Sequence, residues 1–231
     1  LEAAGIDNPI TNTITPIKMS VGKKQGFSIV QYHGNGTNST QHIPHGLGKK
    51  PIAILLKNLD ESVNFDMNLF GSYRAAINSA ESDQNNYQTV GLEDTFTVPS
   101  NSAIHNKANI TYIAYCWAEI EGYSKFGMYR GNGGDNGTFV YLGFKPAWLI
   151  VKQVNGTNAW FYQDTTRNPD NPTSAGGLRA DTSAENTNAK ACDFLSNGFK
   201  WRTATGYGND ADVEYLYMAF AQSPFAHNLA D

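Results

Sequence analysis

Short apolar runs separated by polar, glycine-rich segments make up most of the chain. Residues 52–56 and 147–151 are five-residue apolar runs bounded by proline and polar residues. Such runs are typical of strands that are covered on both faces. Along residues 112–119 small side chains alternate with bulky ones, which predicts a central strand between two packed layers, and residues 215–222 repeat this pattern less strictly. The pattern therefore predicts a β-sheet protein.

Asn-Gly dipeptides separate several of these runs. They begin at Asn35, Asn132, Asn136, Asn155 and Asn197. Because this dipeptide tolerates the positive φ of tight turns, each is predicted to form a hairpin turn.

Helical patterns are few. The best helix candidate is residues 73–82 and a weaker one is residues 183–190, and neither is expected to exceed a turn or two. The predicted fold class is therefore all-β, with β-sandwich architecture, short turns and little helix.

The same sequence pattern occurs twice. Residues 32–36, Tyr-His-Gly-Asn-Gly, return as Tyr-Arg-Gly-Asn-Gly at residues 129–133, and residues 112–119 return at residues 215–222. Three matched blocks in the same order, including the two apolar runs, predict two tandem copies of one module. Glycine turns and apolar runs recur in both copies, whereas no set of catalytic side chains does. The predicted boundaries are a lead-in or attachment arm at 1–25, copy one at 26–122, copy two at 123–225 and a tail at 226–231.

The composition excludes several classes of partner. Charged residues make up 16% of the 231 residues and the formal net charge is −4. Recognition of phosphate needs clustered Lys and Arg, so nucleic acid is not expected as a partner. No apolar run approaches the roughly 20 residues of a membrane-spanning helix, and no signal-peptide layout is present at the N-terminus, so no membrane insertion is expected. Cys116 and Cys192 do not make a disulfide framework, and both are expected to be reduced.

Aromatic and charged side chains gather in residues 160–167. Trp160 and Tyr162 are followed by Asp164 and Arg167. Aromatic rings stack on sugars while polar neighbours bind hydroxyls, so this segment and the loop at 168–179 are predicted to contact a glycan. The alternative interpretation places Trp160 and Tyr162 on one face of a strand as core residues, with Asp164 on the surface at its exit.

Hydrolysis of a glycan would need a second carboxylate facing the first. The sequence does not single out one of the four carboxylates that follow Asp164. These are Asp170, Asp181, Glu185 and Asp193.

Histidines also gather in the first copy, at His33, His42 and His45. A His-x-x-His spacing can place two imidazoles on one metal. However, the second copy has Arg130 and Tyr141 at or near the matching places, so a structural role is predicted and no metal is expected.

Other signatures of catalysis or cofactor binding are missing. The acidic series Asp210, Asp212 and Glu214 lacks the glycine and the loop of an EF-hand. No nucleophile elbow, dinucleotide-binding loop or Walker loop is recognised. No cofactor is therefore expected, and the chain is not predicted to be an enzyme.

Six motifs of the chain are similar to those of one family. They lie at residues 26–37, 45–48, 112–119, 122–127, 141–147 and 193–200. The family they resemble is a domain of unknown function found in virion proteins of marine bacteriophages such as cyanophages, especially tail-fibre-like and appendage proteins. The resemblance covers about residues 26–225 and brings no established catalytic set. The family usually shows a Trp-x-x-Tyr-like strand in both copies, whereas here only the second copy keeps it, at residues 160–162.

The resemblance implies a structural virion appendage, a phage tail fibre or spike domain, that contributes to host-surface attachment without catalysis. The implied partners are a host cell-surface glycan or receptor and other virion proteins, the latter through residues 1–25. A homotrimer is expected, located in the virion and assembled in the host cytoplasm. The alternatives left open are a capsid decoration or head-fibre protein, a glycan-degrading depolymerase and a cellular secreted lectin.

Overall fold

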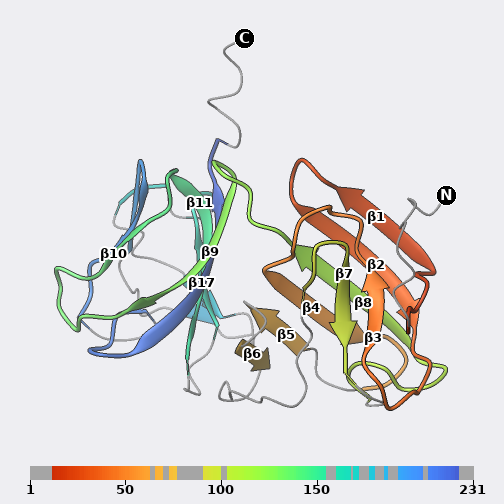
Figure 1. Cartoon of the computed structure of the whole chain (residues 1–231). Helices are drawn as coiled ribbons and strands as arrows, with labels where there is room; N and C mark the ends of the chain where they lie inside the picture. The colour runs from red at the N-terminus through yellow and green to blue at the C-terminus, as the bar shows by residue number, and fades with distance from the viewer. Residues whose placement is uncertain are drawn as a thin grey trace, which may run out of the picture. The chain divides into compact units, whose positions relative to one another are not determined.

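The computed structural model describes residues 12–62, 66–69, 73–76, 91–99, 103–154, 160–167, 169–171, 177–179, 185–186, 192–204 and 208–223. This part of the chain is all-β and contains no helix, hence none that could cross a membrane. The chain divides into two compact units, with the boundary between Glu119 and Ile120 (Figure 1). We call the part before this boundary unit 1 and the part after it unit 2.

Unit 1 contains a six-stranded antiparallel sheet and a two-stranded antiparallel sheet. The large sheet has the order β1-β2-β8-β4-β5-β6, and the small sheet pairs β3 with β7. The strands of the large sheet are β1 (Lys18–Gly22), β2 (Phe27–His33), β8 (Thr111–Trp117), β4 (Ala53–Asn58), β5 (Asp66–Leu69) and β6 (Tyr73–Ala76). Those of the small sheet are β3 (Gln41–Pro44) and β7 (Thr95–Val98).

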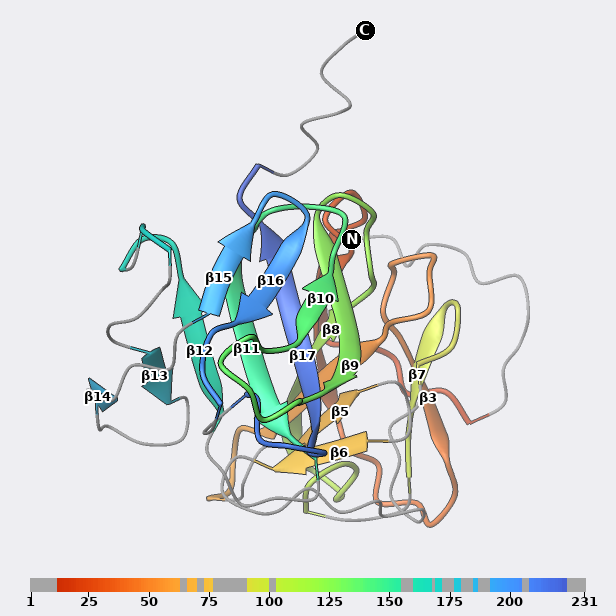
Figure 2. The same cartoon turned by 90° about the vertical axis from the view of Figure 1, so that its left-hand side faces the viewer.

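Unit 2 repeats this layout with additions. Its large sheet has the order β14-β13-β12-β11-β17-β9, and its small sheet the order β10-β16-β15. The strands of the large sheet are β9 (Ser124–Arg130), β17 (Glu214–Ala221), β11 (Pro146–Gln153), β12 (Phe161–Asp164), β13 (Gly177–Arg179) and β14 (Glu185–Asn186). Those of the small sheet are β10 (Phe139–Tyr141), β16 (Gly198–Trp201) and β15 (Cys192–Leu195), which lie over β11 and β17 in Figure 2.

The core of each unit lies between its two sheets. In unit 1 the inner side chains of the large sheet, such as Val30 and Ala114, form one buried cluster with Ile43 and Phe96 of the small sheet. In unit 2 Val151 and Tyr217 belong to the corresponding cluster. Each unit is therefore a two-layer β structure, as predicted for a sandwich.

The two units share their topology. The order β2-β8-β4-β5-β6 of unit 1 corresponds to β9-β17-β11-β12-β13 of unit 2, and the pair β3-β7 corresponds to β10-β16. Matched strands also follow one another in the same order along the chain. This likeness agrees with the two matched sequence patterns, while an origin by duplication stays a prediction.

The strand predictions are confirmed. The two apolar runs form β4 and β11, and β8 occupies the interior of its sheet with strict alternation of buried and half-buried residues. The helix prediction is wrong where it can be compared. Residues 73–76 form β6 and residues 185–186 form β14, because pairing with β5 and β13 supplies backbone hydrogen bonds that a short isolated helix would lack.

The turn predictions are confirmed in one case and wrong in others. Ser196 and Asn197 connect β15 to β16 as a tight hairpin. The dipeptides at Asn35, Asn132 and Asn136 do not form hairpins, because the chain there leaves the large sheet and enters the small one. The dipeptide at Asn155 lies outside the described residues.

The described part of the predicted attachment arm belongs to unit 1. Residues 18–22 form β1, which pairs with β2 at one edge of the large sheet. Ile14 is buried in the core of unit 1. Residues 1–11 lie outside the described part of the chain.

Candidate functional site

Each unit contains the same glycine-rich corner between its two sheets. In unit 1 the corner is Gly34-Asn35-Gly36, which follows β2. The Asn35 N–H donates to Asn106 Oδ1 (2.9 Å), Asn106 Nδ2 donates to Asn35 Oδ1 (2.9 Å), and the Gly36 N–H donates to the Asn106 carbonyl (3.0 Å). A Cβ on Gly34 would lie 2.2 Å from the Lys107 carbonyl oxygen, so only glycine fits there.

The corner of unit 2 repeats these contacts. The Asn132 N–H donates to Asn209 Oδ1 (3.1 Å), and Asn209 Nδ2 donates to Asn132 Oδ1 (3.1 Å). The Gly133 N–H donates to the Asn209 carbonyl (3.0 Å), and a Cβ on Gly131 would lie 2.3 Å from the Asp210 carbonyl oxygen. These backbone N–H groups are satisfied within the protein, so the corners connect sheets and do not present phosphate-binding loops.

A stacked tyrosine pair accompanies each corner. The rings of Tyr32 and Tyr112 are 5.2 Å apart at 16°, and those of Tyr129 and Tyr215 are 5.3 Å apart at 18°. Tyr32 donates to a backbone carbonyl at 2.7 Å, and so does Tyr129. Burial raises the pKa of both Tyr32 and Tyr129 well above the usual value, so both hydroxyls stay protonated.

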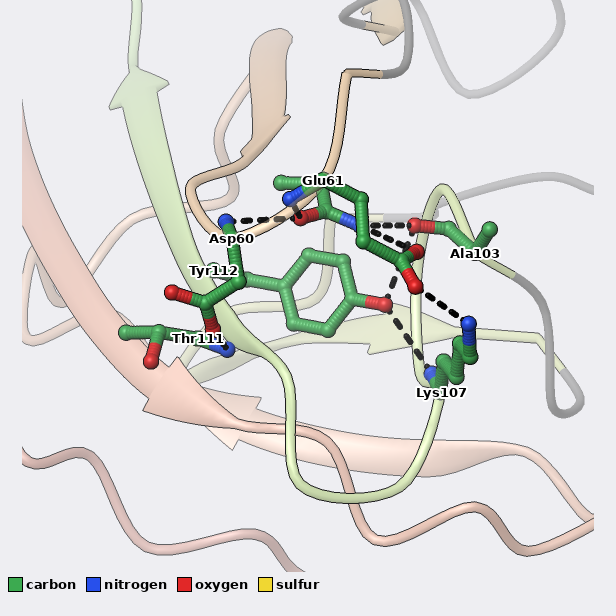
Figure 3. A network of polar contacts seen from close by, with 7 residues as sticks. Asp60, Glu61, Ala103, Lys107, Thr111 and Tyr112 are labelled. Carbon is green, nitrogen blue, oxygen red and sulfur yellow. Dashed lines mark hydrogen bonds and ion pairs between the residues drawn. The ribbon is translucent and has the colours of Figure 1, made fainter.

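A polar network closes the end of β4 in unit 1 (Figure 3). The buried Asn58 accepts hydrogen bonds at Oδ1 from the N–H groups of Asp60 (3.0 Å) and Glu61 (2.9 Å), and its Nδ2 donates to the Ala103 carbonyl (2.7 Å). Glu61 pairs with Lys107. The network thus ties the loop after β4 to the segment before β8.

The same network holds two further groups in place. The Thr111 N–H donates to Asp60 Oδ2 (2.5 Å), and this hydrogen bond is the main reason that the pKa of the Asp60 carboxyl lies below its usual value. Tyr112 Oη accepts from the Lys107 N–H (3.0 Å). Since these groups satisfy one another, the network is interpreted as structural.

Three of the four predicted site residues lie together at the end of β12. Arg167 Nε donates to Asp164 Oδ2 (2.7 Å), and the two side chains form an ion pair with an N–O distance of 2.5 Å. The Arg167 guanidinium also lies over the Tyr162 ring, 4.7 Å from its centroid. Tyr162, Asp164 and Arg167 therefore form one contiguous group, with Asp164 at the strand exit as expected.

The turn after β12 holds Asp164 as a carboxylate. Asp164 Oδ1 accepts from the N–H groups of Thr166 (3.0 Å) and Arg167 (2.9 Å). Partial burial raises the pKa of the Asp164 carboxyl, but the hydrogen bonds and charge of Arg167, with the Thr166 N–H, outweigh it, and the pKa lies below its usual value. A general acid in glycoside hydrolysis needs a raised pKa, so Asp164 suits binding better than proton donation.

Trp160, the fourth predicted site residue, is buried. Its side chain is only 4% exposed, and its buried indole N–H has no hydrogen-bond partner among the residues that the structure describes. The aromatic ring beside Tyr162 is instead that of Trp148, at 6.3 Å, and Phe220 lies 5.6 Å beyond Trp148. Sequence reasoning missed Trp148 because it lies in an apolar run, and only the register, which pairs Trp148 with Asp164, reveals its place.

The predicted loop at 168–179 is described only in part. Asn171 Nδ2 donates to the Phe194 carbonyl, and the Phe194 N–H donates to Asn171 Oδ1, both at 2.9 Å. This amide therefore pairs with the outer edge of β15 as a neighbouring strand would. Residues 168 and 172–176 lie outside the described residues.

The three histidines do not converge on one point. His45 is buried, its Nε2 lies 3.0 Å from the Leu92 carbonyl, and its Nδ1 accepts from the Leu47 N–H (3.1 Å). Burial lowers the pKa of His45, which agrees with a neutral structural imidazole. His33 and His42 contact different threonines.

The remaining carboxylates of interest are spread over unit 2. Asp193 pairs with Arg202 (2.5 Å), while Asp212 and Glu214 lie near Arg130, at 3.9 and 3.7 Å. Within the described ranges no group of three or more His, Cys, Asp or Glu side chains could hold a metal ion. Asp181 lies outside those ranges.

Comparison with known proteins places the chain in one family. The model of Domain of unknown function (DUF7483) matches residues 3–224. The chain belongs to this family. The match confirms the predicted membership in a domain of unknown function, and it spans both units. No curated protein and no solved structure matches the chain.

In this DUF7483 chain, unit 2 alone carries the group around Tyr162. Register places Met67 and Leu69 of unit 1 at the positions of Tyr162 and Asp164, since Leu55 and Ala53 of β4 correspond to Ile150 and Trp148 of β11. The candidate site is therefore a feature of one unit and not of the shared scaffold.

Proposed function

We propose that the chain is a structural, non-catalytic module of a bacteriophage virion appendage, a tail fibre or spike, that contributes to host-surface attachment by binding a glycan. The observation that carries the proposal is the group of Tyr162, Asp164 and Arg167 beside Trp148. Half-buried rings offer apolar faces to the C–H groups of a sugar, and a fixed ion pair beside them offers polar atoms to its hydroxyls.

The scaffold supports the same proposal. Two-layer β units with tightly bonded corners suit a rigid external part, on which loops and strand ends provide recognition. The proposed assembly is a homotrimer, in which several weak sites act together. The proposed contact with other virion proteins involves residues 1–25, which include β1, the edge strand of the large sheet in the described part of unit 1, and an edge strand can accept a further strand.

Adsorption of the purified full-length chain to host cells tests this function. We expect the double variant Tyr162→Ala/Arg167→Ala to lose adsorption by at least about tenfold, since about 1.4 kcal/mol corresponds to each tenfold change. Leu59→Ala, which changes an exposed side chain of unit 1, is the matched control and should adsorb normally. Unchanged adsorption by a correctly folded double variant would remove the site from the proposal.

Two further measurements separate this function from its alternatives. Release of reducing sugar from host polysaccharide by the purified chain would contradict a non-catalytic role. Electron microscopy of particles labelled with an antibody against the chain should show the label on an appendage, and label over the capsid surface would instead indicate a decoration protein.

A further inference from the structure

A second aromatic surface lies on the outer face of the small sheet of unit 2. Phe139 and Tyr141 alternate along β10 with the buried Val140, so both rings point away from the core. Phe139 is 43% exposed and Tyr141 is 60% exposed. Among the described residues no other Phe, Tyr or Trp side chain is as exposed as these two. Their Cα atoms lie about 7 Å apart, the span of two residues in a strand.

The strand next to β10 leaves room for these rings. Gly198 of β16 is directly opposite Tyr141, and a Cβ built on Gly198 would lie 3.1 Å from Phe139 Cε2. Because Gly198 has no side chain, the Phe139 ring extends over the backbone of β16. We call Phe139, Tyr141 and Gly198 the β10 platform.

Two lysines border the β10 platform. Lys125 Nζ lies over the Tyr141 ring, 5.6 Å from its centroid. Lys200 is directly opposite Phe139, and directly opposed residues of an antiparallel pair lie on the same face of the sheet. Asp193 of β15 is directly opposite Lys200, and its carboxylate forms an ion pair with Arg202 (2.5 Å). The platform thus has a positive border on a chain whose net charge is −4.

The size of the platform argues against a protein partner. Aromatic side chains offer about 150–250 Å² each, so the exposed parts of two rings amount to roughly 200 Å². A stable protein interface takes about 800 Å² from each partner, mostly around a continuous apolar centre. Two rings in a line with ammonium groups beside them instead match a sugar polymer, whose C–H faces stack on the rings and whose carboxylates pair with the lysines.

We infer that the β10 platform is a binding site for an acidic polysaccharide, with Phe139 and Tyr141 stacking on sugar rings and with Lys125 and Lys200 binding uronate carboxylates. This inference rests on the proposed function in that both take a glycan as the ligand, but it assigns a different surface and a charged ligand class. Unit 1 has His42 and Pro44 at the positions of Phe139 and Tyr141, so the site belongs to unit 2 alone.

The test is affinity electrophoresis of the full-length chain in gels that contain alginate, carboxyl-reduced alginate or a neutral dextran. We expect alginate to retard the wild-type chain, and the two uncharged polymers to retard it at least tenfold less. Tyr141→Ala should weaken the apparent affinity for alginate about tenfold. Lys125→Gln/Lys200→Gln should weaken it by a similar factor at low salt and less at high salt, because salt screens exposed charges.

A matched control makes the result decisive. Leu59→Ala, checked by circular dichroism for an intact fold, should bind alginate like the wild type. Equal binding of alginate by wild type and Tyr141→Ala, no binding by the wild type, or a change of sedimentation in Tyr141→Ala that reveals an interface between copies would each overturn the inference. The proposed function fails separately, if the wild-type chain does not adsorb to host cells.

Discussion

Unit 1 and unit 2 place equivalent atoms around their corners, yet they present different side chains on equivalent strands. Asn109 and Asp212 adopt nearly the same positive φ, 65° and 62°. In each unit the N–H of the next residue donates to a backbone carbonyl three residues earlier, Ile110 to Lys107 and Val213 to Asp210. On the strand surfaces, by contrast, His42 stands in unit 1 where the exposed Phe139 stands in unit 2. A residue that makes buried polar contacts can be replaced by few others, because a buried group without its hydrogen bond lowers stability. Exposed positions can vary and can therefore acquire side chains that bind a ligand.

The corners nevertheless differ in the number of hydrogen bonds that each buried asparagine makes. Asn209 Oδ1 accepts from two N–H groups, and its Nδ2 donates to Asn132 Oδ1 and to two carbonyls, those of Gly134 (3.0 Å) and Thr203 (2.7 Å). Asn106 makes three side-chain contacts, one of them at 3.5 Å. The comparison therefore predicts a stronger dependence of unit 2 on its asparagine.

The largest expected effect is that of removing these amides. Asn209→Ala should reduce the stability of unit 2 by about 3–4 kcal/mol, and Asn106→Ala that of unit 1 by about 2–3 kcal/mol, at about 1 kcal/mol for each net hydrogen bond. Hydrogen exchange followed by mass spectrometry resolves the loss in each unit. Asn38→Ala, at an exposed position of unit 1, should change stability by less than about 0.5 kcal/mol. A larger loss for Asn106→Ala would reverse the comparison.

An intermediate effect is expected at the tyrosine pairs. Tyr129 accepts a hydrogen bond from the buried Trp201 Nε1 (2.8 Å) in addition to donating to the Gly208 carbonyl, whereas Tyr32 donates to the His105 carbonyl and accepts no hydrogen bond from the described residues. Tyr129→Phe should therefore cost about 2–3 kcal/mol and Tyr32→Phe about 1 kcal/mol in urea unfolding.

A double-mutant cycle with Trp201→Phe sharpens this result. Because the second change removes the unsatisfied indole N–H, the two losses in unit 2 should sum to more than the loss in the double variant. Strict additivity would show that the Tyr129–Trp201 hydrogen bond contributes nothing to the difference between the units.

The smallest effect is expected for Asp164 of unit 2, whose position in unit 1 is occupied by Leu69. The folded pKa of Asp164 lies below its unfolded value of about 3.9, so its stabilisation is complete above that pH and is lost as the pH falls through the folded pKa. Asp164→Asn should lower stability at pH 7 by about 0.5–1 kcal/mol, and the difference should vanish toward pH 2. Unfolding curves measured across this pH range check it, and a pH-independent difference would contradict the ion-pair explanation.

Much of the scaffold could be predicted from the sequence. The apolar runs of β4 and β11 and the alternation along β8 indicated these strands correctly, because periodicity of burial is written directly in the order of side chains. The corners at Asn35 and Asn132 were mistaken for hairpins, because Asn-Gly specifies a positive φ but not the sheet that the chain enters next. Residues 73–76 were mistaken for a helix because their pairing partner, β5, is not a local feature.

The candidate site was predictable only in part. Asp164 and Arg167 are three residues apart, so a turn brings them together locally, whereas the position of the Arg167 guanidinium over the Tyr162 ring is a finding of the structure. Trp148 lies far from them in sequence and reaches them through the register of β11 with β12. Trp160 is buried, in line with the alternative interpretation of the sequence, whereas Tyr162 is only half-buried.

By itself the sequence determined the all-β class, the two matched patterns and the glycines that the corners require, because these follow from local conformational preference and from the spacing of apolar side chains. The tertiary structure decided which sheet each strand joined, which aromatic rings became exposed and which charges met. These outcomes depend on contacts between residues distant in the chain, whose energies arise only once the register of the strands is set.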